Sequence, residues 1–246
     1  MEKISTSWYS DRVGREVTTV RWGFYGKPVL IFPTAGGDAE EIERFHVLDV
    51  LEELITAGRI KVYSCDSVAG RVLLTREGSH AHQCRMISSF QEFVYREVVP
   101  AIRMDCKEEA AQVIVSGASI GAFNSLAMIC RFPDAFSHAL CLSGTYDIER
   151  FLEQRGTQDF YDASPVHYLP QSPDDATLAA LRERYILFAS GEGKAEDIGE
   201  SWRAASILGR RRVPNRVDSW GADWPHDWPT WRKMWPKYLE ELTAKQ

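Results

Sequence analysis

The stretch VIVSGASIGAFNSL, residues 113–126, decides the fold of this chain. It begins with an apolar β-type run, turns at Gly117-Ala-Ser-Ile-Gly121, and continues as a helical pattern that ends near Pro133. Glycines on both sides of Ser119 remove the side chains that would clash in a strained strand-to-helix turn. The hydroxyl then projects at the helix start, where the free N–H of Ile120 can stabilise an oxyanion. The stretch therefore predicts a serine nucleophile.

Strand-type runs alternate with helical patterns around this stretch. The first two runs read as an antiparallel hairpin, and the later, continuously apolar runs are typical of buried parallel strands. The expected strands are 3–10, 15–22, 27–32, 60–64, 113–115, 137–143, 185–189 and 215–220, and the expected helices are 39–57, 85–104, 120 to about 132, 175–182, 198–208 and 228–243. This alternation indicates one α/β domain over residues 1–246, with a mainly parallel sheet flanked by helices.

Three further expectations concern the connections. Residues 66–83 show no clear periodicity and read as a surface loop. Pro100 falls late in the helix pattern 85–104 and is expected to kink it. Residues 152–183 are long enough for a small insertion over the sheet, so no large lid is expected.

Composition excludes several function classes. The net charge of −6, without a basic patch, argues against nucleic acid as a partner. No run approaches the roughly 18 apolar residues of a membrane span, and the first residues lack a signal-peptide pattern. The five cysteines, odd in number and without a C-x-x-C, read as reduced thiols of a cytoplasmic protein. His80, His82 and Cys84 form the nearest metal-ligand pattern, and their spacing predicts no metal site and no cofactor.

A serine nucleophile needs a histidine base, and three histidines follow Ser119. His138 begins a buried strand and reads as structural, and His167 lies in the insertion as a weaker candidate. His226 follows the last strand, where the chain order of this fold requires the base. Trp224 and Trp228 flank it and are expected to line a substrate pocket.

The acid that orients the histidine should follow the strand 185–189. The candidates there are Glu192, Glu196 and Asp197. We favour Asp197 at the start of the next helix, with Glu192 as its main rival. The second oxyanion donor is expected from the glycine loop after strand 27–32, as the backbone N–H of Ala35 or Gly36.

Four segments resemble the esterase D-type branch of the α/β-hydrolases, whose relatives include S-formylglutathione hydrolases, feruloyl esterases and mycolyltransferases. These are FQEFVYREVVPAIR, VSGASIGAFNSL, RFPDAFSHALCLSGTYD and FYDASPVHYLP, and the resemblance runs from about residue 28 to the end of the chain. It implies an α/β-hydrolase fold with Ser119 as nucleophile, Asp197 as acid and His226 as base. It also implies an oxyanion hole made by Ile120 and by Ala35–Gly36. The chain departs from the family in having Pro33-Thr34 where His-Gly is common, and in lacking the longer loops of the relatives.

These features predict a cofactor-independent serine hydrolase. The expected substrate is a small-molecule carboxylic ester with a short-chain or small aromatic acyl group, cleaved through an acyl-enzyme. Acyl transfer or thioester hydrolysis by the same triad is an alternative, and a binding protein that keeps only the fold is another. The sequence leaves open whether the chain forms a homo-oligomer.

Overall fold

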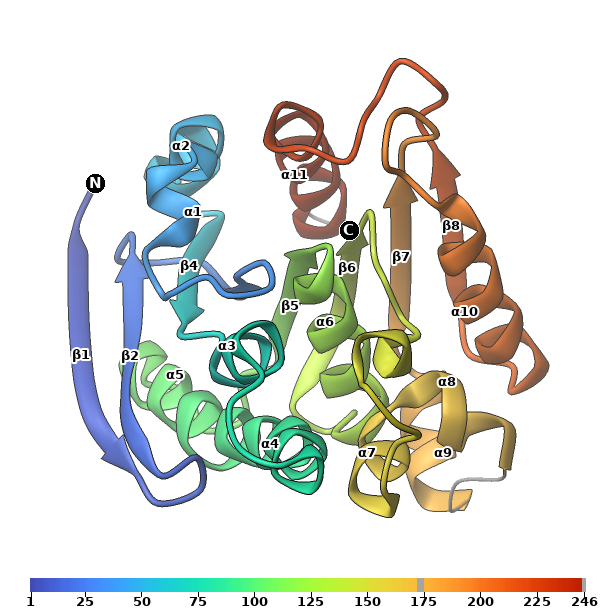
Figure 1. The fold of residues 1–246 in the computed structure, drawn as a ribbon. Coiled ribbons are helices and arrows are strands. Elements are labelled where there is room, and N and C mark those ends of the chain that lie inside the picture. Colours follow the sequence, from blue (N-terminus) through green and yellow to red (C-terminus); the bar gives the residue numbers. More distant parts are fainter. Residues whose placement is uncertain (172–174, 245–246) are drawn as a thin grey trace.

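The computed structural model describes residues 1–171 and 175–244, and within them one eight-stranded sheet lies between two layers of helices (Figure 1). The spatial order of the strands is β1-β2-β4-β3-β5-β6-β7-β8. The hairpin β1–β2 is antiparallel and joins β4 in an antiparallel pair, whereas the pairs from β4 to β8 are parallel. The prediction of a mainly parallel sheet is therefore confirmed. The strands are β1 Lys3–Ser10, β2 Arg15–Trp22, β3 Lys27–Phe32, β4 Ile60–Cys65, β5 Val113–Ala118, β6 Phe136–Leu142, β7 Tyr185–Ser190 and β8 Asn215–Ser219.

The helices cover both faces of the sheet because each buries an apolar stripe against it. Side chains of α1, α2 and α11 form one hydrophobic cluster with one face of the sheet. Side chains of the helices from α3 to α10 form a second cluster with the other face. The α-helices are α1 Glu41–Arg44, α2 Val47–Thr56, α3 Val68–Thr75, α4 His80–Phe93, α5 Val99–Cys106, α6 Ile120–Arg131, α7 Gln158–Ala163, α8 Pro165–Tyr168, α9 Asp175–Arg182, α10 Ile198–Arg210 and α11 Trp228–Thr243. A π-helix, η1 Val94–Val98, and two 3₁₀ helices, η2 Ile148–Phe151 and η3 Leu169–Gln171, complete the set.

The structure corrects three sequence expectations. The helix expected at 39–57 is divided into α1 and α2 by His46, which adopts a left-handed backbone with φ +60°. The loop expected at 66–83 contains α3 and the start of α4, and buried Val68 and Val72 form an i,i+4 apolar pair that the glycines and polar residues of this stretch obscured. The helix expected at 85–104 is divided into α4, the π-helix η1 and α5. Pro100, which cannot donate a helical hydrogen bond, lies in the first turn of α5, and the kink expected there stays a prediction.

The fold brings the ends of distant strands together. The carboxyl ends of β3, β5, β6, β7 and β8 lie at the same edge of the sheet because these strands are parallel. In open α/β sheets this edge carries the ligand site. In the part of the chain that the structure describes, no helix is long and apolar enough to cross a membrane.

Candidate active site

Ser119 lies between β5 and α6 with φ +57° and ψ −120°, a strained backbone conformation for a residue other than glycine. The glycines beside it are required by space. A Cβ on Gly117 would lie 2.4 Å from the backbone of Gly121, and one on Gly121 would lie 2.6 Å from the carbonyl oxygen of Phe32. The first turn of α6 thus packs directly on the end of β3.

His226 lies between β8 and α11, and its ring contacts two neighbours. The ring packs edge-to-face against Trp231, with centroids 5.1 Å apart. Its Nδ1 is 3.3 Å from Oε2 of Glu196. The side chain of His226 is 24% exposed, whereas that of Glu196 is 1% exposed. An imidazole that donates from Nδ1 to this carboxylate keeps Nε2 as an acceptor.

Glu196 is held in place by two serine hydroxyls. Ser143, which follows β6, donates from Oγ at 2.5 Å, and Ser190, the last residue of β7, donates at 3.2 Å. Burial alone would raise the pKa of Glu196, but the hydrogen bonds from His226 and Ser143 outweigh it and hold that pKa below its usual value. The carboxylate is therefore ionised at neutral pH and suited to stabilise an imidazolium.

The carboxylate against His226 is thus not that of Asp197, the residue favoured from the sequence. Asp197 caps α10, since its Oδ1 accepts the N–H of Gly199 at 3.0 Å. Glu192, the rival candidate, accepts a hydrogen bond from Ser219 instead. Glu192, Glu196 and Asp197 all follow β7, so chain order does not distinguish them. In the sequence, Asp197 is favoured because the next helix begins directly after it. The burial of Glu196 depends on Ser143, which is distant in sequence.

The loops that carry Glu196 and His226 are joined by backbone hydrogen bonds and lie side by side beyond β7 and β8 (Figure 1). The N–H of Glu192 donates to Gly221, that of Gly193 donates to Trp224, and that of His226 donates to Lys194, over 2.9 to 3.1 Å. These contacts hold the two loops in one register, so the position of the acid fixes the position of the histidine.

The expected oxyanion donors also lie at this edge of the sheet. Ile120 is the first residue of α6, and the first N–H groups of a helix have no acceptor within it. Ala35 and Gly36 lie in the loop that follows β3, on which α6 packs. Thr34 of the same loop is bound to Glu41, which the sequence did not single out.

The tryptophans beside His226 pack on other aromatic rings. Trp224 lies edge-to-face on Trp220, with centroids 4.8 Å apart, and Trp228 stacks on Phe45 at 4.2 Å. Both side chains are half-buried, and their part in lining a substrate pocket stays a prediction. Trp231 and Trp235, which follow on α11, are 4% and 1% exposed and pack in the core.

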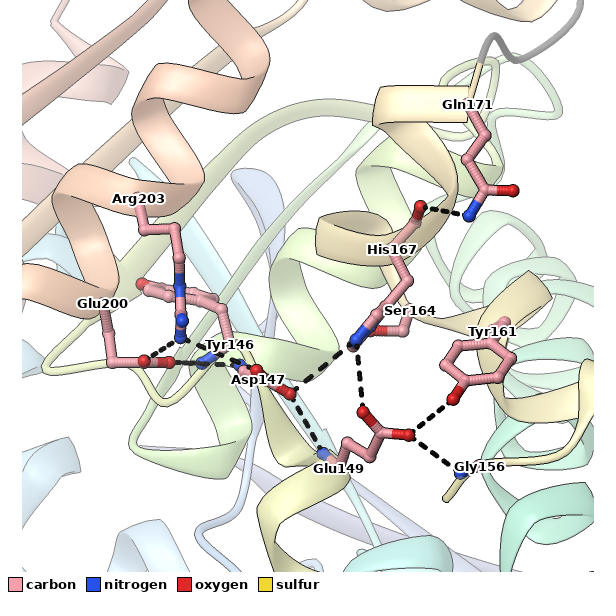
Figure 2. Close-up of polar contacts among 10 residues, drawn as sticks. All are labelled: Tyr146, Asp147, Glu149, Gly156, Tyr161, Ser164, His167, Gln171, Glu200 and Arg203. Atoms are coloured by element: carbon pink, nitrogen blue, oxygen red, sulfur yellow. Dashed lines mark hydrogen bonds and ion pairs between the residues drawn. The ribbon is translucent and has the colours of Figure 1, made fainter.

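His167, the weaker candidate base, belongs to a separate polar cluster with Asp147 and Glu149 (Figure 2). Its Nε2 is 3.9 Å from Asp147 and 3.7 Å from Glu149, and its Nδ1 lies 2.8 Å from the hydroxyl of Ser164. One ligand atom from each of the three residues lies within 4.8 Å of the others, a spacing that could hold a cation. Arg203 lies 3.9 Å from Asp147 and already offsets part of its charge. The cluster joins the loop after β6 to α8.

The comparison with known families decides the relationship of this chain. Residues 55–241 match the family described as "Putative esterase". The chain belongs to this esterase family. It is a carboxylic ester hydrolase.

The esterase is also similar to several solved structures. A ferulic acid esterase shares 17% identity, with a TM-score of 0.75 and 98% of each chain covered. An S-formylglutathione hydrolase from Staphylococcus aureus shares 14% identity, with a TM-score of 0.71, covering 99% of this chain and 96% of that one. An S-formylglutathione hydrolase from Agrobacterium tumefaciens shares 10% identity, with a TM-score of 0.73, covering 98% of this chain and 94% of that one. At these identities the likeness concerns the fold. No curated protein matches the chain significantly.

Proposed function

We propose that this esterase cleaves small-molecule carboxylic esters through an acyl-enzyme on Ser119, with His226 as base and Glu196 as the acid of the triad. The contact between His226 Nδ1 and buried Glu196 carries the proposal, because it fixes the tautomer in which Nε2 can take a proton. The strained turn at Ser119 supports its part as nucleophile.

The proposed reaction assigns one step to each of these residues. Ser119 Oγ attacks the ester carbonyl carbon while its proton passes to His226 Nε2. The N–H of Ile120 and an N–H of Ala35 or Gly36 stabilise the negative charge on the carbonyl oxygen. The imidazolium then protonates the leaving alcohol, and the C–O bond breaks to give the acyl-enzyme. Water, activated by the same imidazole, attacks the acyl carbon and releases the acid and free Ser119.

The segment between β6 and β7 supports a preference for small acyl groups. It contains short helices, η2, α7, α8, η3 and α9, none longer than 8 residues within the described part. No large lid is formed by these helices, so a long acyl chain would lack a cover. We therefore expect short-chain or small aromatic acyl groups to react best.

We also infer that residues 1–246 act as one domain in a reducing compartment such as the cytoplasm. Both hydrophobic clusters of the described residues pack on the same sheet, which supports the first statement. All five cysteines are free thiols, which supports the second.

The test is ester hydrolysis together with covalent labelling. p-Nitrophenyl esters from acetate to decanoate should be hydrolysed with an optimum at the short end, and Ser119→Ala should lose the activity. A fluorophosphonate probe should label the folded wild-type protein at Ser119 and leave Ser119→Ala unlabelled. A folded wild-type protein that is neither labelled nor active would overturn the proposal.

A further inference from the structure

The loop after β3, residues 33–38, is held by a carboxylate from the helix that follows it. Glu41, the first residue of α1, is 7% exposed. Its Oε2 accepts the backbone N–H of Thr34 at 2.6 Å, and its Oε1 accepts the hydroxyl of Thr34 at 2.8 Å. One buried carboxylate thus receives two hydrogen bonds from a single residue of the loop.

Other polar groups of the loop have partners as well. Ser67 donates from its hydroxyl to the carbonyl of Ala35 at 3.2 Å and from its N–H to the carbonyl of Gly37 at 3.1 Å. The N–H of Gly37 donates to Thr34 at 3.3 Å. Among the hydrogen bonds of residues 1–171 and 175–244, none uses the N–H of Ala35 or of Gly36. Within the described residues, neither N–H group has a protein acceptor.

The loop packs closely against Glu41 and against α3. A Cβ on Gly37 would lie 2.4 Å from the carboxylate of Glu41. A Cβ on Gly70, in α3, would lie 1.8 Å from the carbonyl oxygen of Ala35. The carboxylate and the backbone of α3 thus both touch the loop, and removal of the carboxylate would leave a gap beside it.

Burial of the ionised Glu41 carboxylate costs free energy. Burial raises the pKa of Glu41 more than the two hydrogen bonds from Thr34 lower it. An ionised carboxylate nevertheless accepts shorter and stronger hydrogen bonds than a neutral acceptor does. That accuracy matters for an oxyanion hole, where donors must lie about 2.7–3.1 Å from the developing charge.

We propose that Glu41 is a positioning residue of the oxyanion hole, which clamps Thr34 so that the N–H groups of Ala35 and Gly36 face the carbonyl oxygen of an ester at Ser119. The inference rests on the proposed function of Ser119.

The experiment compares Glu41→Ala and Glu41→Gln with the control Glu40→Gln, which changes a neighbour whose side chain is 46% exposed and paired with Lys3. We expect kcat on p-nitrophenyl acetate to fall about 100-fold in Glu41→Ala and about 10-fold in Glu41→Gln, because glutamine keeps one acceptor oxygen. KM should change less than about threefold, since ground-state binding does not need the aligned donors. Glu40→Gln should match the wild type.

A second readout does not depend on turnover. Hydrogen exchange of the Thr34 amide, followed by NMR, should be slow in the wild type and Glu40→Gln, and faster in both Glu41 variants. Glu41→Gln serves if Glu41→Ala does not fold. Unchanged exchange at Thr34, or an unchanged kcat in a folded Glu41 variant, would overturn the clamp. A wild-type protein without ester turnover would refute the proposed function, while the exchange data would still decide whether Glu41 holds Thr34.

Discussion

At the scale of single residues, Glu196 and Asp197 show how adjacent carboxylates take on different tasks. Glu196 turns inward, where Ser143 and His226 contact it, and Asp197 caps the helix that begins at Ile198. Both are acids at the expected place in the chain. Their separation comes from direction alone, because consecutive side chains at a helix start point to different sides of the backbone.

This difference in role predicts different effects on kcat for substitutions of the two residues. Glu196→Gln removes the charge that stabilises the imidazolium and should lower kcat about 10³ to 10⁴-fold while the protein stays folded. Asp197→Asn keeps a side chain that can cap the helix and should stay within about twofold of the wild-type kcat. Steady-state kinetics on a short p-nitrophenyl ester measures both. A loss in Asp197→Asn as large as that in Glu196→Gln would sink the assignment of the acid.

At the scale of elements, the hairpin β1–β2, which pairs with β4, is also joined to η1 by the carboxylate of Glu97. This carboxylate accepts hydrogen bonds from Trp8 at 2.7 Å, Ser10 at 2.9 Å and Arg12 at 3.0 Å. Burial would raise the pKa of Glu97, but these three donors outweigh it and hold the pKa below its usual value.

The attachment should make stability depend on pH in a defined direction. A carboxyl group with a lowered folded-state pKa contributes stability above its unfolded pKa and loses it as the pH falls through the folded pKa. Glu97→Gln should therefore lower the free energy of unfolding by about 1–2 kcal/mol at pH 7. The difference from wild type should shrink below about pH 4.5, the ordinary value for this group. Urea unfolding at several pH values tests this, with the exposed Glu16→Gln as control. A difference that is constant with pH would contradict it.

At the scale of the whole molecule, the last helix, α11, packs in one hydrophobic cluster with strands and helices from the first half of the chain. Trp235 of α11 is 1% exposed, and its Nε1–H donates to the hydroxyl of Ser116 on β5 at 2.9 Å. Ser116 in turn donates to the carbonyl of Leu140 on β6 at 2.9 Å. The same helix packs beside α2, far away in sequence (Figure 1).

Removal of this side chain should weaken the entire fold. Trp235→Ala leaves a cavity and should cost about 3–5 kcal/mol of unfolding free energy. Trp202→Ala, at a position that is 54% exposed, should stay within about 0.5 kcal/mol of the wild type. Urea denaturation followed by far-UV circular dichroism measures both. Equal effects of the two substitutions would mean that α11 does not complete the core.

The sequence by itself predicted the type of sheet, the tight turn at Ser119 and the loop that carries His226. The alternation of apolar strands and periodic helices predicted the mainly parallel sheet, because burial of both faces leaves a local trace in each strand. The glycines beside Ser119 predicted the tight turn, because backbone sterics act within a few residues. Chain order also put His226 in the loop after β8, which is where it lies.

Only the tertiary structure decided which side chains meet. Glu196 faces His226 because Ser143 and Ser190 enclose it, and Thr34 is held by Glu41 because α1 folds back on the loop. The helix α3 escaped prediction because its apolar pair packs against other elements and is too short to show a period. The physical reason is the same in each case: burial and hydrogen bonding depend on neighbours that the chain supplies from distant positions, whereas periodicity and steric strain are properties of adjacent residues.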